Sequence, residues 1–296
     1  MKPPPFTYHR PADVDEAVAL LARLTEAGEH PKVLAGGQSL IPLLSMRLAA
    51  PTHLVDINAL PGLDSIEVGS GSVTVGALVR HRALERHEGA YAAIPLLRQA
   101  LSNVAHPTIR NRGTTVGSIC HADPASEMPA VLALLGGSVT ARSVRGSRTI
   151  DAADLFVGPL ESSLEPDELA VQAVFPLLPP RTGTAVVELA RRHGDYAMCG
   201  VVVAVSLDDE GCVVSARAAY VSAGDQIAPV DLTEPVAGVA SVAAQWVQAA
   251  ALARAQVSTE ADIHASADYR SHLVAVLTER ALREASARAV PMEVAA

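Results

Sequence analysis

The chain has 296 residues, of which 49% are hydrophobic and 19% charged, and its formal net charge is −9 at pH 7. This composition is typical of a globular protein long enough for two or three domains. The negative charge argues against a nucleic-acid partner, and no uninterrupted apolar segment is long enough to span a bilayer. Residues 1–5 lack the apolar core of a signal peptide, so we expect a cytoplasmic protein.

The first part of the chain is predicted to alternate strands and helices. Asp13 and Glu16 have the spacing of a capping box, and an apolar stripe at helical spacing follows them. Short apolar runs at residues 33–35 and 54–57 are predicted to be strands, with a helical turn over residues 40–48 between them. This order predicts a small α/β lobe with parallel strands.

Two adjacent glycines, Gly36 and Gly37, stand between the first of these strands and the helical turn. Glycine adopts backbone angles closed to other residues and leaves its amide N–H open to a ligand. Free N–H groups at the positive end of a helix form a site for an anion such as a phosphate, and Ser39 can add a hydroxyl donor. A plain strand-to-helix turn remains the alternative.

A second lobe follows and is predicted to be α+β and mostly antiparallel. Alternating residues on both sides of a Gly-Ser-Gly turn predict a hairpin. The predicted elements are the hairpin at 65–76, helices at 80–86, 94–101 and 128–135, and strands at 138–141 and 169–175.

A second polar loop, within residues 108–130, is dense in Gly, Thr, Ser, Asn and Asp between apolar segments. Small hydroxylated residues and glycines supply many donors at close range, as a bound diphosphate needs. Two such loops in one domain suggest a dinucleotide held from both sides. Neither loop has the G-x-G-x-x-G of a Rossmann turn, and the chain has no P-loop.

The proline-rich segment 176–181 is predicted to be a domain boundary. Strand-like runs at 185–191, 198–207 and 212–222 follow, with a hairpin turn at 208–211 and a last helix at about 268–289.

The three cysteines, Cys120, Cys199 and Cys212, are widely spaced and form no C-x-x-C pair. This argues against a disulfide framework, a zinc site or an iron–sulfur cluster built by this chain alone. We expect all three to be packing residues, although Cys120 falls inside the second loop and so close to any ligand held there.

The two loops together resemble a known family. Residues 35–40 resemble the AGGxSL signature, and residues 109–127 the IRNxGTxGGxxxHADPAxE signature, of the FAD-binding medium subunits of molybdenum hydroxylases. The resemblance continues over nearly the whole chain, with family-like motifs at 6–11, 53–57, 191–197 and 264–270.

The resemblance implies an α+β fold with two domains. The first, over residues 1–177, would be a two-lobed FAD-binding domain of the PCMH/vanillyl-alcohol-oxidase-like type, with lobes at about 1–58 and 59–177. The second, over residues 182–291, would be a C-terminal domain with a three-stranded sheet and helices.

The resemblance also implies the residues that hold FAD. The two loops would bind its diphosphate from two sides, Glu127 would bond the ribityl hydroxyls, and Tyr196 would stack on the isoalloxazine ring. Asp123 would lie along the flavin, although its position before Pro124 also predicts a helix cap. The implied cofactor-binding residues are Ala35, Gly36, Gly37, Gln38, Ser39, Leu40, Thr114, Thr115, Gly117, Ser118, Asp123, Glu127 and Tyr196. No catalytic residue and no metal ligand is predicted in this chain.

One position departs from the family pattern. Val116 stands where many relatives have the first glycine of GTxGG, and valine tolerates positive φ poorly. We therefore expect this loop to follow a slightly different path, which leaves the side-chain role of Thr115 open.

The resemblance places the other redox centres on partner chains. A large subunit would carry the molybdenum cofactor and a small subunit the [2Fe-2S] clusters, in a dimer of heterotrimers. Electrons would pass from the clusters through FAD to an acceptor such as oxygen, NAD or a quinone-linked carrier. A stand-alone FAD-dependent oxidase and a non-catalytic nucleotide-binding or assembly module are the alternatives.

Overall fold

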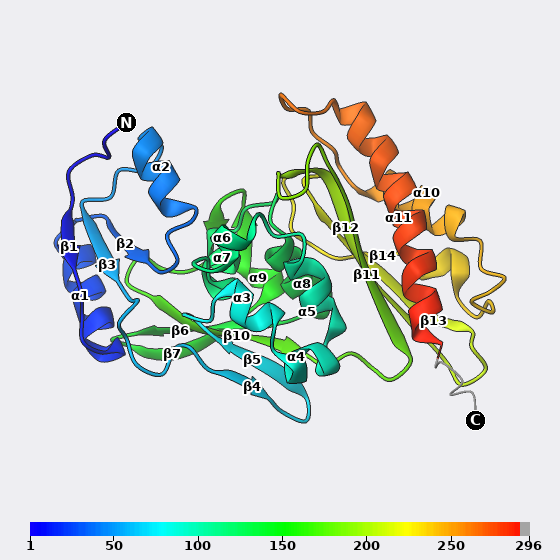
Figure 1. Cartoon of the computed structure of the whole chain (residues 1–296), viewed down its shortest axis with the longest axis horizontal. Coiled ribbons are helices and arrows are strands. Elements are labelled where there is room, and N and C mark those ends of the chain that lie inside the picture. Colours follow the sequence, from blue (N-terminus) through cyan, green and yellow to red (C-terminus); the bar gives the residue numbers. More distant parts are fainter. Residues whose placement is uncertain (291–296) are drawn as a thin grey trace.

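The computed structural model describes residues 1–290 and places three units in a row along the long axis (Figure 1). Residue 291, the last of the predicted C-terminal domain, lies outside the described residues. No helix within residues 1–290 combines the length and the apolar character needed to cross a bilayer.

The first unit is the small parallel lobe that the sequence predicted. Its sheet has the order β1-β3-β2 and all its strands are parallel. Asp13 caps α1 by accepting a hydrogen bond from the Glu16 amide at 2.8 Å, and the Glu16 carboxylate accepts from the amide of Ala12 at 2.7 Å. The elements are β1 (Thr7–His9), α1 (Val14–Glu26), β2 (Pro31–Leu34), α2 (Leu40–Met46) and β3 (His53–Asp56).

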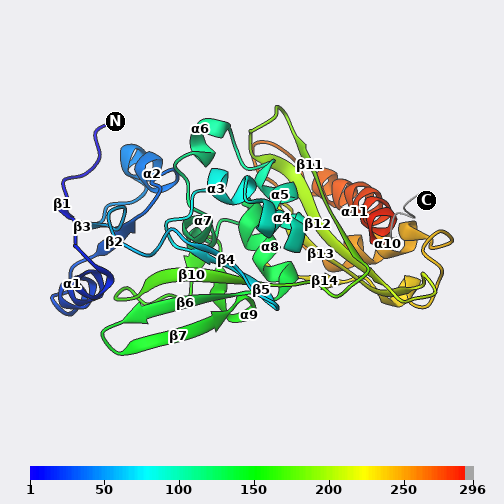
Figure 2. The same cartoon turned by 60° about the horizontal axis from the view of Figure 1, so that its bottom comes forward.

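The second unit is built on a five-stranded antiparallel sheet of order β4-β5-β10-β6-β7. Figure 2 shows this sheet on one side of the helices that connect its strands. Its strands are β4 (Ile66–Val68), β5 (Ser72–Gly76), β6 (Ser138–Ser143), β7 (Gly146–Asp151) and β10 (Leu169–Pro176), and β8 (Phe156–Gly158) pairs with β9 (Glu161–Ser162) beside it. Its helices are α3 (His81–Glu85), α4 (Glu88–Ala93), α5 (Pro95–Leu101), α6 (Pro107–Arg110), α7 (Thr115–His121), α8 (Glu127–Leu135) and α9 (Ala152–Leu155).

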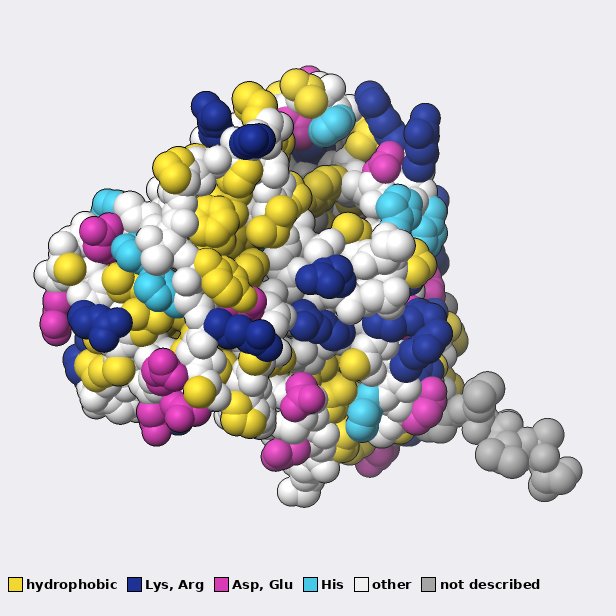
Figure 3. Space-filling model, turned by 60° about the vertical axis from the view of Figure 1, so that its left-hand side comes forward, with side chains coloured by type: hydrophobic (Ala, Val, Ile, Leu, Met, Phe, Trp, Pro, Cys, Tyr) yellow, Lys and Arg dark blue, Asp and Glu magenta, His cyan; other side chains and the backbone are white. Residues whose placement is uncertain are grey.

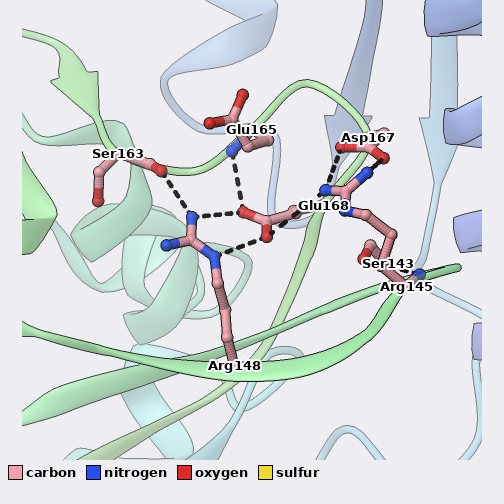
Figure 4. A network of polar contacts seen from close by, with 7 residues as sticks. All are labelled: Ser143, Arg145, Arg148, Ser163, Glu165, Asp167 and Glu168. Atoms are coloured by element: carbon pink, nitrogen blue, oxygen red, sulfur yellow. Dashed lines mark hydrogen bonds and ion pairs between the residues drawn. The ribbon is translucent and has the colours of Figure 1, made fainter.

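Paired charges fix the segment before β10 onto the β6–β7 hairpin (Figure 4). Arg148 binds both carboxylate oxygens of the buried Glu168, at 2.7 and 2.8 Å, and Arg145 pairs with Asp167. Although burial by itself raises the pKa of Glu168, the Arg148 guanidinium holds it below its usual value. The pairs therefore stabilise this corner of the second unit.

The third unit is a sheet of order β11-β12-β13-β14 with helices on one face. The three predicted strands are confirmed, and the two-residue β14 adds a fourth. The elements are β11 (Thr182–Ala190), β12 (Ala197–Leu207), β13 (Val213–Val221), β14 (Val230–Asp231), the 3-10 turn η1 (Glu234–Val236), α10 (Trp246–Gln256) and α11 (Ala267–Ala289). The predicted turn before β13 has its Gly211 at φ +80°, a conformation that suits glycine.

Both faces of the C-terminal sheet are buried, because side chains alternate along its strands. On β12, Val202 and Ala204 join the core of the first two units, whereas Val201 and Val203 join the core formed with α10 and α11. Figure 1 shows α8 and α11 on opposite sides of β12. The first two units therefore pack directly against the inner face of this sheet.

Candidate functional site

The first glycine loop leaves β2 at the carboxyl end of the parallel sheet. Gly37 has φ +73°, and the hydroxyl of Ser39 makes no capping bond to α2. Within residues 1–290, the amide N–H groups of Gly37, Gln38 and Ser39 donate to no backbone or side-chain acceptor. The loop therefore presents several free donors, as binding of a phosphate requires.

The second loop ends in a short helix. Thr114 caps α7, because its hydroxyl accepts a hydrogen bond from the amide of Gly117 at 3.2 Å. A Cβ atom at Gly117 would lie 2.5 Å from that hydroxyl, so glycine leaves room for the cap. Val116 is buried inside α7 and is not among the residues with positive φ. The backbone at Val116 is therefore one that valine adopts without strain.

The two loops touch each other through their backbones. A Cβ atom at Gly36 would lie 2.5 Å from the carbonyl oxygen of Arg112, 2.8 Å from the Cα atom of Gly113 and 3.0 Å from the amide nitrogen of Thr114. Gly117 in turn lies close to the side chain of Ala35. The loops thus form one continuous surface, with Ser118 half-buried beside it.

The guanidinium group of Arg80, which belongs to neither loop, links the two loops through hydrogen bonds. Arg80 donates to the carbonyl oxygen of Arg112 at 2.6 Å and to the side-chain oxygen of Asn58 at 2.7 Å. Asn58 donates in turn to the carbonyl oxygen of Ala35 at 2.8 Å. Neither Arg80 nor Asn58 is predicted from the sequence, because no local motif marks a contact between segments so far apart in the chain.

Thr115 lies behind the second loop. Its side chain is buried with its hydroxyl 3.2 Å from Nδ1 of His81, and its amide donates to the carbonyl oxygen of Val79. Burial, and then the charge of Arg110, lowers the pKa of His81 to about 4, so this imidazole is neutral at pH 7. The Thr115 side chain therefore packs against the protein interior.

Asp123 does not cap a helix that starts at Pro124, contrary to the prediction. Its carboxylate accepts from the amide of Ala125 at 2.9 Å, which closes a turn, and α8 begins only at Glu127. The turn forms because a short Asp side chain reaches a backbone N–H two residues on. Burial raises the pKa of Glu127 to about 7, and the negative charge of Asp123 adds to the shift.

Tyr196 lies on the loop between β11 and β12 and exposes 68% of its surface. The loop turns at Gly194, whose φ is +89° and whose backbone lies against His106. Local burial of the hydroxyl, and the charges of Asp123 and Glu127, raise the pKa of Tyr196. The aromatic ring is therefore available to a ligand near the start of α8.

The remaining groups fit a packing role. Burial raises the pKa of the Cys120 and Cys199 thiols to about 12, which makes both poor nucleophiles at neutral pH.

Within residues 1–290, no group of three or more His, Cys, Asp or Glu side chains is placed to hold a metal ion. A surface pocket of about 640 Å³ lies away from both loops, between residues 28–32, residues 49–51 and Leu164.

Comparison with known proteins agrees with this geometry. Residues 4–178 match the family described as the FAD binding domain in molybdopterin dehydrogenase, and residues 184–285 match the CO dehydrogenase flavoprotein C-terminal domain. The chain belongs to the family of FAD-binding medium subunits of molybdenum hydroxylases. It is therefore an oxidoreductase subunit, and FAD is its cofactor.

Individual relatives match over almost their full length. The chain is 40% identical to the 6-hydroxypseudooxynicotine dehydrogenase complex subunit alpha of Paenarthrobacter nicotinovorans, over 98% of both chains. It is 33% identical to the carbon monoxide dehydrogenase medium chain of Afipia carboxidovorans, over 98% of this chain and 99% of the relative. The crystal structure of quinoline 2-oxidoreductase from Pseudomonas putida 86 matches with a TM-score of 0.90 and 33% identity, covering 98% of this chain and 99% of that one. The resemblance inferred from the sequence and the predicted fold class are thus confirmed.

Proposed function

We propose that this chain is the FAD-binding electron-transfer subunit of a heterotrimeric-type molybdenum hydroxylase. FAD, when bound, supplies the redox chemistry, accepting electrons from [2Fe-2S] clusters of a partner and delivering them to an external acceptor. The work of this chain is to bind and orient the cofactor. The observation that carries the proposal is the direct contact of two glycine loops, one of which has amide donors without acceptors in residues 1–290.

The residues fit the parts of FAD in distinct ways. The free amides of residues 37–39 are the proposed donors to the diphosphate, and the cap at Thr114 and Gly117 shapes the opposite wall. Among the implied residues, Thr115 contributes through its packing on His81, since its hydroxyl points into the interior. Asp123 and Glu127 are proposed to lie along the ribityl chain and flavin, beside Tyr196.

The partner chains are inferred from the family, whose members include a subunit of a dehydrogenase complex and a medium chain of carbon monoxide dehydrogenase. By this resemblance the molybdenum cofactor is assigned to a large partner subunit and the [2Fe-2S] clusters to a small one. The face in Figure 3 gathers hydrophobic side chains near its middle, with Lys and Arg around them. Exposed Ile41, Met46 and Leu48, on and after α2, are candidates for partner contacts. A cytoplasmic dimer of heterotrimers is the proposed assembly.

The proposed domain division places residues 1–177 in the FAD-binding domain and residues 182–291 in the C-terminal domain. It is supported by the second hydrophobic cluster, to which Ala185 and most of the buried apolar residues of α10 and α11 belong. FAD is proposed to lie between the first two lobes, with the β11–β12 loop of the C-terminal domain reaching over it.

Gentle purification from the native host, with an absorption spectrum and a subunit count on the same sample, tests the proposal. Flavin bands together with iron–sulfur absorption, and one larger and one smaller copurifying chain, would support it. A yellow single chain that turns over a substrate alone would instead establish a stand-alone oxidase. Colourless protein that takes up no FAD would favour a nucleotide-binding or assembly module.

A further inference from the structure

Glu188 lies on the inner face of the C-terminal sheet, where no site residue was predicted. Along β11, the hydroxyl of Thr184 donates to the side chain of Gln99 on α5 at 3.0 Å, and Val186 packs into the core of the first two units. Val187 packs on the opposite face with α10 and α11. Because side chains alternate along a strand, Glu188 points toward the FAD-binding domain.

One oxygen of the Glu188 carboxyl group is shielded from solvent. Glu188 pairs with Gly200 on β12, and a Cβ atom at Gly200 would lie 2.6 Å from the Cγ atom of Glu188. Oε1 of Glu188 is shielded from solvent and has no hydrogen-bond partner in the described part of the chain. An ionised carboxylate in such a place is costly, so the protonated form is favoured.

A second carboxyl group, that of Glu127, belongs to a helix start held beside the same row of residues. Gly200 pairs in turn with Val221 on β13, and the amide of the next residue, Ser222, donates to the carbonyl oxygen of Pro124 at 2.9 Å. Glu127 is the first residue of α8, which packs against β12 and β13. Burial raises the pKa of Glu188 to about 8, and the negative charge of Glu127 adds to that shift. The two carboxyl groups therefore compete for ionisation, as close like charges do.

The other charged and titratable groups around the pair do not remove this competition. Asp123, in the turn before α8, raises the pKa of Glu127 further, and Arg110 on α6 opposes that rise. Tyr196, on the β11–β12 loop, is uncharged at neutral pH because its pKa is raised. Behind the sheet, the charge of Arg270 lowers the pKa of Cys199, whereas the charge of Glu188 raises it. No cation among residues 1–290 forms an ion pair with either carboxylate of the pair.

We propose that Glu127 and Glu188 form a carboxyl pair across the domain interface that shares one proton at neutral pH. When FAD is bound, the pair loses this proton less readily. The second half rests on the proposed function, because Glu127 is taken to lie along the bound cofactor. The ribityl chain and flavin, which are proposed to lie along Glu127, would exclude water from that carboxyl group, and the diphosphate of the same cofactor would add negative charge to the site. Both effects disfavour loss of the shared proton. By linkage, FAD affinity falls as the pH rises.

Titration of the apo full-length chain with FAD tests this inference. Between about pH 6 and about pH 9, the Kd should rise by about tenfold for each unit by which FAD raises the pKa of the pair. Glu188→Gln keeps the shape of the side chain and removes its titration, so the pH dependence should become weaker, with the remainder due to Glu127. Glu67→Gln, at an exposed position on β4, is the matched control and should behave like the wild type.

Two further measurements separate the possible outcomes. Calorimetry in buffers of different ionisation enthalpy should detect proton uptake on FAD binding by the wild type and less uptake by Glu188→Gln. Without FAD, Glu188→Gln should be more stable than the wild type at about pH 9, because it removes a buried charge. Tight FAD binding with a pH-independent Kd and no proton uptake would overturn the inference while leaving the proposed function intact. Absence of FAD binding in the wild type and every variant would overturn the proposed function instead. If the apo forms of the wild type and Glu188→Gln were then equally stable at about pH 9, the shared proton would be overturned as well.

Discussion

The α-carbon of Gly36 lies so close to the carbonyl oxygen of Arg112 that a Cβ atom would come within 2.5 Å of it. The obstacle is backbone, which cannot rotate away as a flexible side chain can. Glycine at this position is therefore required by the contact between the two loops rather than by an unusual φ, which distinguishes it from Gly37.

Gly36→Ala is expected to push the loops apart and weaken FAD binding by at least about tenfold, with a loss of stability of about 1–3 kcal/mol from the enforced backbone shift. Fluorescence titration with FAD and thermal denaturation measure the two effects. Gly71→Ala is the matched control, since a Cβ atom there meets nothing within 4 Å. Unchanged FAD affinity in Gly36→Ala would mean that the contact between the loops does not shape the site.

Arg80 provides a second test of the same geometry. Arg80→Ala removes the bonds to the carbonyl oxygen of Arg112 and to Asn58, so the loops lose an external tie. We expect FAD affinity to fall by about tenfold, which corresponds to about 1.4 kcal/mol. Arg80→Lys should recover little, because an ammonium group lacks the planar fork that reaches both acceptors. Arg283→Ala, which breaks an exposed pair on α11, is the control and should leave FAD affinity unchanged.

These tests mark the limit of prediction from the sequence. The loops, the β4–β5 hairpin and the strands of the third unit follow from local patterns, because glycine geometry and side-chain alternation act over a few residues. Arg80 and Glu188 have no such signal. Arg80 becomes a tie only when residues 35, 58 and 112 meet, and Glu188 becomes a buried acid only when α8 covers the sheet. The Asp123 cap was wrong because Asp before Pro predicts a helix start, whereas its side chain closes a turn here.

Tyr196→Ala is expected to weaken FAD binding or slow reoxidation of the bound flavin, with little change in thermal stability, because most of the ring is exposed. Stopped-flow reoxidation of the reduced holoprotein and FAD titration measure these effects. Tyr196→Phe should retain most of both properties, since the ring and not the hydroxyl is proposed to stack. Tyr269→Ala, which removes a partly exposed ring from α11, is the control. Full FAD content and normal reoxidation in Tyr196→Ala would exclude the stacking role.

His81 gives a prediction about acid stability. Its pKa is lowered from 6.5 to about 4 by burial first, so the unfolded chain binds a proton more readily than the folded chain. Its contribution to stability is therefore full above pH 6.5 and is lost as the pH falls from there toward 4. The loss amounts to about 2 kcal/mol at about pH 5, given about 1.4 kcal/mol per pKa unit.

The difference in unfolding free energy between the wild type and His81→Gln, measured against pH, isolates this contribution. The carboxyl pair of Glu127 and Glu188 changes stability in the opposite direction over the same range, but it is common to both proteins and cancels in the difference. At about pH 7.5 we expect His81→Gln to be less stable than the wild type, because the variant loses native packing. At about pH 5 the difference in unfolding free energy between the two proteins should be smaller by about 2 kcal/mol, because only the wild type loses stability on acidification through His81. His272→Gln, at an exposed position on α11, is the control for removal of an imidazole. A pH-independent difference for His81→Gln would show that the folded protein accommodates the protonated imidazole behind the second loop.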